Sequence, residues 1–140
     1  MIGRIQLFQP NNSNVSFTSY QSPLKTLFKK GKMPSVKYGL YGQKITPKNV
    51  SLEHLKPHSE GGVSALRNFA LADKFENSRR SSEPLKNVCD WEMVREYLSQ
   101  FNFRIKGFDG FKYQELIIKT CKSLDIPDLL PWKKELMKKK

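Results

Sequence analysis

Two histidines, one acidic residue and two asparagines lie close together in the middle of the chain. His54 and His58 are the only histidines among the 140 residues, and Glu53 directly precedes the first of them. Asn68 follows His54 by fourteen positions, and Asn77 follows Asn68 by nine. Carboxylate and amide oxygens are hard ligands that suit Mg²⁺. The residue types therefore indicate a magnesium site, provided that the fold brings Glu53 and Asn77 together.

The elements predicted around these residues are a strand, a long loop, a second strand and a helix. Residues 50–55 contain a β-branched residue and end before a proline, which cannot donate a hydrogen bond to a neighbouring strand. Two glycines favour a turn at 59–62, and residues 69–72 form a short apolar run typical of a strand. Asp73 is a suitable N-cap for a helix over residues 74–80.

This order of elements constrains which side chains can meet. Neighbouring residues of a strand point to opposite faces, so Glu53 and His54 can share one target only where the strand ends or twists. Asn77 lies in the first turns of the predicted helix, from which it can reach back over the strand end to Glu53. We therefore expect an acid, an imidazole and an amide around one cation.

The motifs of this stretch resemble those of the HNH endonucleases, which have a ββα-metal (His-Me finger) fold. The similarity rests on Leu-Lys-Pro at residues 55–57, Gly-Gly at 61–62 and Asn-Phe-Ala-Leu at 68–71. The spacing of His54, Asn68 and Asn77 is similar to that in the HNH domain of RNA-guided CRISPR nucleases. The resemblance covers about thirty to forty residues, and its several agreeing parts make it fairly specific.

The resemblance implies a role for each matched residue. His54 would be the general base that takes a proton from the attacking water. Glu53 and Asn77 would hold one divalent ion, Mg²⁺ or Mn²⁺, against the scissile phosphate. Asn68 would either orient His54 or hold the loop by hydrogen bonds, and His58, which has no fixed role in the family, could approach a phosphate.

The sequence departs from the family pattern at two points. The usual acid is aspartate, whereas Glu53 is one methylene longer, which leaves open a protein that keeps the fold without catalysis. Many relatives also carry a zinc ion held by two Cys-x-x-Cys pairs, but Cys89 and Cys121 are far apart, and residues 38–42 are Tyr-Gly-Leu-Tyr-Gly where the first pair would lie. We expect no structural zinc, with apolar and aromatic packing in its place.

The charge of the chain predicts a nucleic-acid partner. The formal net charge is +12, and residues 1–52 contain eight basic residues and no acid, so Glu53 is the first acidic residue. Phosphate contacts supply most non-specific affinity for DNA, and RNA is not excluded as a partner. The candidate contacts are the basic side chains near the predicted site and in the first quarter of the chain: His58, Lys74, Arg79, Arg80, Lys29, Lys30, Lys32 and Lys37.

We expect one α+β domain with three parts: a basic N-terminal arm (1–36), a ββα-metal core (37–84) and a helical extension (85–140). The arm is predicted either to form two short strands before residue 22 or to be partly disordered, with a brief helix at 23–30. Helices are predicted at 90–101 and 112–124, with a connector at 103–111 and a short last helix from Pro131. No disulfide framework, signal peptide or membrane-length run is evident, so we expect a cytoplasmic protein; nothing indicates its oligomeric state.

Two functions follow as hypotheses. The first is a metal-dependent HNH endonuclease that hydrolyses phosphodiester bonds of DNA. Nickase activity is one form of it, because one ββα-metal centre cuts one strand at a time. Compact zinc-free HNH proteins are common in phages and mobile elements. The alternative is a non-catalytic nucleic-acid-binding protein on a ββα-metal scaffold.

Overall fold

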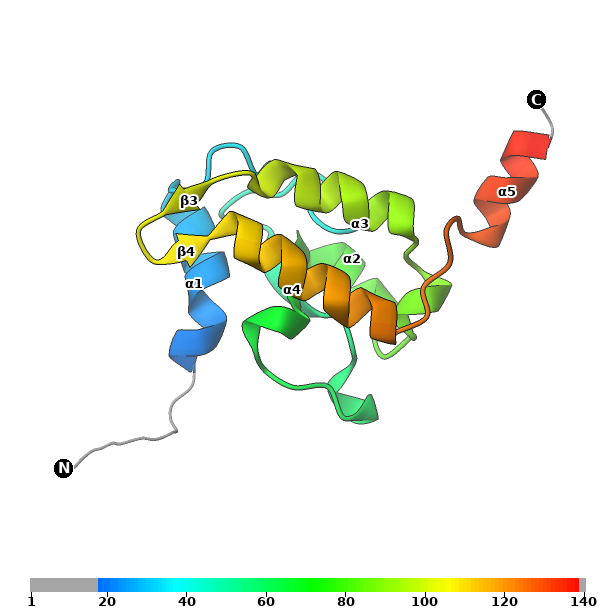
Figure 1. Ribbon diagram of the computed structural model, residues 1–140. Coiled ribbons are helices and arrows are strands. Elements are labelled where there is room, and N and C mark those ends of the chain that lie inside the picture. Colours follow the sequence, from blue (N-terminus) through cyan, green and yellow to red (C-terminus); the bar gives the residue numbers. More distant parts are fainter. Residues whose placement is uncertain (1–17, 139–140) are drawn as a thin grey trace.

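The computed structural model describes residues 18–138 and combines helices with two small sheets, an α+β architecture (Figure 1). The strands predicted before residue 22 fall within residues 1–17, which lie outside the described part of the chain. The first helix, α1 (Thr18–Lys29), begins earlier than the predicted helix at 23–30 and contains Pro23. It contributes Leu24 and Phe28 to the hydrophobic core.

The predicted strand, loop, strand and helix are present. The strands β1 (Val50–His54) and β2 (Phe69–Asp73) pair in antiparallel fashion, and Glu53 lies opposite Ala70. The helix α2 (Lys74–Arg80) follows β2 directly. Its N-cap is the predicted one, because the Asp73 carboxylate accepts hydrogen bonds from the first free backbone N–H groups of the helix.

The segment before β1 runs beside β2 and brings Tyr41 to the hairpin. The Leu40 N–H donates to the Leu71 carbonyl at 2.8 Å. Gly39 is required here, since a Cβ atom at this position would lie 2.8 Å from the Cα of Ala72. Residues 38–42 are therefore held by backbone pairing and by the buried Leu40.

A helical layer covers the hairpin, built from α3 (Trp91–Leu98) and α4 (Gly110–Ser123) (Figure 1). The predicted connector between them contains a short hairpin, β3 (Arg104–Ile105) and β4 (Phe108–Asp109). Gly107 turns this hairpin with a φ of +88°, a backbone conformation that glycine adopts without strain.

Two buried tyrosines fasten this layer to β2. The hydroxyls of Tyr97 and Tyr113 lie 2.9 Å apart. The Leu71 N–H donates to the Tyr97 hydroxyl at 2.9 Å, and the Tyr113 hydroxyl donates to the Phe69 carbonyl at 2.6 Å. These bonds satisfy backbone groups of β2 inside the core and fix the hairpin on which the candidate site stands.

The remaining elements are short. The last helix, α5 (Pro131–Lys138), begins at Pro131 as predicted and projects from the end of the helical layer (Figure 1). None of the helices between residues 18 and 138 is long and apolar enough to cross a membrane. Four 3₁₀ turns complete the structure: η1 (His58–Glu60), η2 (Leu66–Asn68), η3 (Leu85–Asn87) and η4 (Ser99–Phe101).

Candidate active site

Glu53 points from β1 toward α2 and is almost completely buried, with 4% of the residue exposed. Its Oε2 atom accepts a hydrogen bond from the Tyr41 hydroxyl at 2.5 Å. The same oxygen lies 3.4 Å from the Nη1 atom of Arg80, whose side chain is also buried. The acid that the sequence singles out is therefore held between a neutral donor and a cation of the protein itself.

The surroundings of Glu53 favour its protonated form. Burial raises the pKa of the carboxyl above its ordinary value, and this effect exceeds the opposing ones of the Tyr41 hydrogen bond and the Arg80 charge. A buried carboxylate whose charge is only partly balanced gains stability from additional positive charge nearby.

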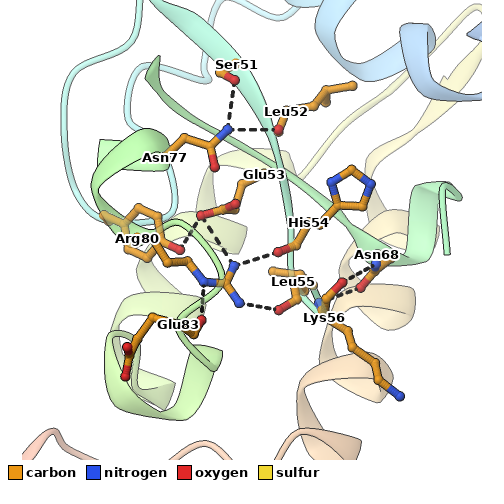
Figure 2. A network of polar contacts seen from close by, with 11 residues as sticks. Ser51, Leu52, Glu53, His54, Leu55, Lys56, Asn68, Asn77, Arg80 and Glu83 are labelled. Carbon is orange, nitrogen blue, oxygen red and sulfur yellow. Dashed lines mark hydrogen bonds and ion pairs between the residues drawn. The ribbon is translucent and has the colours of Figure 1, made fainter. Parts of the chain in front are cut away.

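Asn77 lies on α2 with its amide anchored to β1. Its Nδ2 atom donates to the Ser51 hydroxyl at 2.9 Å and to the Leu52 carbonyl at 3.1 Å. These bonds fix the orientation of the amide, and its oxygen has no partner among the hydrogen bonds of residues 18–138. In Figure 2 this oxygen points toward the Glu53 side chain.

His54 lies on the other side of β1. Its imidazole packs edge-on against the Phe69 ring at 4.8 Å between centroids, and its Nε2 atom lies 3.5 Å from the Ser64 hydroxyl. Burial lowers the pKa of His54, and the positive charges of His58 and Arg80 lower it further. Both effects favour the neutral imidazole, which is the form that can accept a proton.

The expected convergence of three groups is thus found only in part. Glu53 and Asn77 face one another, whereas the His54 imidazole points away from Glu53 (Figure 2). The reason is the alternation of side chains, because His54 directly follows Glu53 and remains within the regular pairing of β1. A phosphate that met both groups would have to lie over the end of this strand.

Asn68 holds the loop between the two strands. Its Oδ1 atom accepts from the Lys56 N–H at 2.9 Å, and its Nδ2 atom donates to the carbonyls of Lys56 and Val63 at 3.1 and 2.9 Å. No hydrogen bond joins it to His54 in the described part of the chain. Two roles were open for Asn68, to orient His54 or to hold the loop. Its hydrogen bonds hold the loop, so Asn68 is a positioning residue.

The turn of the same loop requires glycine. A Cβ atom on Gly62 would lie 1.8 Å from the Lys56 carbonyl oxygen, and Gly61 has a φ of +88°. No other residue fits at Gly62 without movement of the backbone. The Gly-Gly motif therefore allows the loop to fold back on the end of β1, where Ser64 meets His54.

Arg80 does not lie where the sequence analysis expected it. As a phosphate contact it would need to be exposed, but its guanidinium is buried and bonded to three backbone carbonyls (Figure 2). Nη1 donates to His54 at 2.6 Å, Nη2 to Leu55 at 2.8 Å and Nε to Glu83 at 2.8 Å. Arg80 therefore joins the end of α2 to the end of β1 and is not available to a phosphate.

The other predicted contacts for nucleic acid lie at the surface. The Arg79 side chain is 65% exposed and lies 3.2 Å from Glu76. The remaining ones are also exposed: His58, Lys74, Lys29, Lys30, Lys32 and Lys37. Their placement leaves each of them accessible to a polyanion.

Tyr41 is the partner of Glu53 that the sequence analysis did not identify. Burial raises the pKa of its hydroxyl, and the nearby Glu53 charge raises it further, so the hydroxyl stays protonated and donates to Glu53. Tyr41 lies twelve positions before Glu53, in a segment without regular structure. The one sequence signal for this contact is that Tyr41 belongs to the aromatic Tyr-Gly-Leu-Tyr-Gly run that precedes the predicted site.

Glu53 and Asn77 are the two side chains here whose oxygens would hold a divalent cation. The Asn77 oxygen is left without a partner by the bonds that fix its nitrogen, and the buried Glu53 carboxylate lies in the direction in which it points. Within residues 18–138 no three His, Cys, Asp or Glu side chains gather into a metal-binding group. The protein would therefore supply one carboxylate and one amide, with water and phosphate oxygens as the other ligands, as is usual for Mg²⁺.

No family model, curated protein or solved structure matches the chain.

Proposed function

We propose that the protein is an HNH-type endonuclease that hydrolyses phosphodiester bonds of DNA with the help of Mg²⁺ or Mn²⁺. The observation that carries this proposal is the orientation of the Glu53 and Asn77 side chains toward one another. An acid on a strand and an amide on the following helix point toward one another, and a neutral histidine stands at the end of the same strand. The motifs that resemble those of HNH endonucleases follow the same order of strand, loop, strand and helix, with glutamate in place of the usual aspartate.

His54 has the properties of the general base. Burial and the charges of His58 and Arg80 lower its pKa and so favour the neutral ring, which is the form that would take a proton from water. The Ser64 hydroxyl at 3.5 Å and the Phe69 ring restrict the orientation of the imidazole. Asn68 supports this arrangement indirectly, since it fixes the loop that carries Ser64.

Glu53 and Asn77 would hold the divalent ion. When bound, such an ion stabilises the negative charge that develops on the phosphate and on the leaving oxygen. The task of the chain is to hold the two oxygens in place. Asn77 is fixed by its bonds to Ser51 and Leu52, and Glu53 is fixed by Tyr41.

The charge of the protein supports DNA as the polyanion. The net charge is +12, and Lys74 and Arg79 lie exposed on the helix that carries Asn77. Exposed lysines also lie at the end of α1 and in the segment that follows it. Contacts of this kind recognise the phosphate backbone of DNA and RNA alike, so both substrates belong in the test.

A nicking assay on supercoiled plasmid tests the proposal. The wild-type protein should convert the plasmid to its open circular form with Mg²⁺ and should not do so with EDTA. His54→Ala should reduce the rate by about 100-fold or more, because the proton acceptor is lost, while plasmid binding is retained. Glu115→Ala, an exposed position on α4 away from the site, is the control and should keep the activity. Unchanged cleavage by His54→Ala would refute the role of this residue.

A second function is favoured by the contact between Glu53 and Arg80. Because a guanidinium lies 3.4 Å from the acid, the protein already balances part of the charge that a metal would balance. A non-catalytic nucleic-acid-binding protein needs no more than this. It would bind plasmid or RNA in a salt-dependent manner and would leave the substrate intact with every divalent ion tested.

A further inference from the structure

Arg80 supplies Glu53 with a cation that belongs to the chain. Both side chains are buried, with 2% and 5% of their side-chain surfaces exposed. A buried carboxylate without a nearby positive charge is costly, so the pair makes the ionised acid tolerable inside the protein. The same carboxylate is the acid that the proposed function assigns to a divalent ion.

We propose that Arg80 competes with the divalent cation for Glu53 and so sets the cation affinity of the site. This inference rests on the proposed function and adds a regulating residue to its centre. Arg80 does not touch the substrate in this scheme. It determines how much cation is needed before the carboxylate leaves its internal partner.

The geometry allows Glu53 to exchange partners while Arg80 stays in place. The guanidinium is anchored by three bonds of 2.6 to 2.8 Å to backbone carbonyls, whereas its contact with the Glu53 oxygen is 3.4 Å long. The longest contact is the weakest of the four. The carboxylate can therefore turn from the guanidinium without the loss of the bonds that join α2 to β1.

The charge of Arg80 then acts against the incoming ion. A guanidinium and a divalent cation that approach the same carboxylate repel one another, and the repulsion is only partly screened in a buried site. Tyr41 is a neutral donor to the same oxygen and adds no such repulsion. Removal of the charge of Arg80 should thus raise the cation affinity, whereas removal of the Tyr41 hydroxyl should have a smaller effect.

Mn²⁺ binding measured by calorimetry tests this competition. Arg80→Gln should bind Mn²⁺ about tenfold more tightly than the wild type or better. Arg80→Lys is the matched control because it keeps the charge, and its affinity should stay close to that of the wild type. The double variant Glu53→Gln with Arg80→Gln should lose the gain. An affinity of Arg80→Gln equal to or below that of the wild type overturns the inference.

A measurement on the wild type keeps the test valid if Arg80→Gln does not fold. Mg²⁺ is added while the side-chain NMR signals of Arg80 and Asn77 are followed. The inference expects both to shift with the same apparent Kd, because the guanidinium loses the carboxylate as the amide oxygen gains the ion. A shift of Asn77 alone overturns the competition but leaves the proposed site intact. Absence of binding in every variant overturns the cation site itself and this inference with it.

Discussion

Two buried carboxylates of this protein each face a cation of the chain, yet their surroundings differ. Asp90 is fully buried and lies 3.0 Å from the Nζ atom of Lys133. It also accepts hydrogen bonds from the backbone N–H groups of Met93 and Leu130 at 3.0 and 2.9 Å. Glu53, by contrast, has one hydroxyl donor at 2.5 Å and a cation at 3.4 Å.

The pKa values of the two acids consequently shift in opposite directions. Burial opposes ionisation of Asp90, but the N–H groups of Met93 and Leu130 and the charge of Lys133 together hold its pKa below the ordinary value. For Glu53, burial prevails and the pKa is raised. A carboxylate with a full set of donors stabilises the fold, whereas one with an incomplete set gains from a further cation. This difference separates a structural ion pair from a candidate site.

The largest expected effect is on the structural pair. Asp90→Ala should lower the free energy of unfolding by about 1 to 3 kcal/mol, since the buried N–H of Leu130 loses its acceptor and Lys133 keeps only its exposed partner Glu92. The loss of the N-cap of α3 adds to this cost. Urea denaturation measures the change. Glu92→Ala is the control, because it removes only the exposed second partner of Lys133 and should cost less than about 1 kcal/mol.

A smaller effect is expected in the pH dependence of the free energy of unfolding, and its sign should differ between the two acids. Glu53 has a raised pKa in the folded state, so its contribution is complete below pH 4.5 and is lost as the pH rises through the folded value. Asp90 has a lowered pKa, so its contribution is present above pH 3.8 and is lost as the pH falls. Unfolding of wild type, Glu53→Gln and Asp90→Asn from pH 3 to pH 7 compares them.

The wild type should therefore lose stability relative to Glu53→Gln as the pH rises from 4.5, and should lose its advantage over Asp90→Asn as the pH falls below 3.8. The same pH trend for both variants would contradict the distinction between the two acids. A reference variant without a titrating partner, Thr120→Ser, should follow the wild type throughout.

The parts of the fold that the sequence predicted are those with local signals. The capping residues Asp73 and Asp90 mark the first turns of α2 and α3, and the short apolar run at 69–72 identifies β2. Pro131 marks the start of α5. In each case the relevant interaction joins residues close in sequence, so the amino-acid pattern contains the information.

The contacts of Glu53 could not be predicted in this way. Tyr41 reaches it from an irregular segment, and Arg80 reaches it from the far end of α2. From the sequence alone, two adjacent arginines are both predicted to be exposed phosphate contacts. Only the packing of α2 against β1 shows that Arg80 is buried and Arg79 is exposed. The position of His54 was missed because the regular strand continues through it, so no twist brings it round to Glu53.

The smallest effect on stability is expected for an ion pair that lacks burial. Arg79 and Glu76 lie 3.2 Å apart on the surface of α2, in contrast to the buried pairs of Glu53 and Asp90. Arg79→Ala should change the free energy of unfolding by no more than about 0.5 kcal/mol. If Arg79 contacts phosphate, the same variant should weaken DNA binding and reduce the slope of log K against log salt by about 1. An unchanged slope together with normal stability would show that Arg79 does not contact nucleic acid. A large loss of stability would contradict the inference that burial and the number of donors decide how much an ion pair contributes to the stability of this protein.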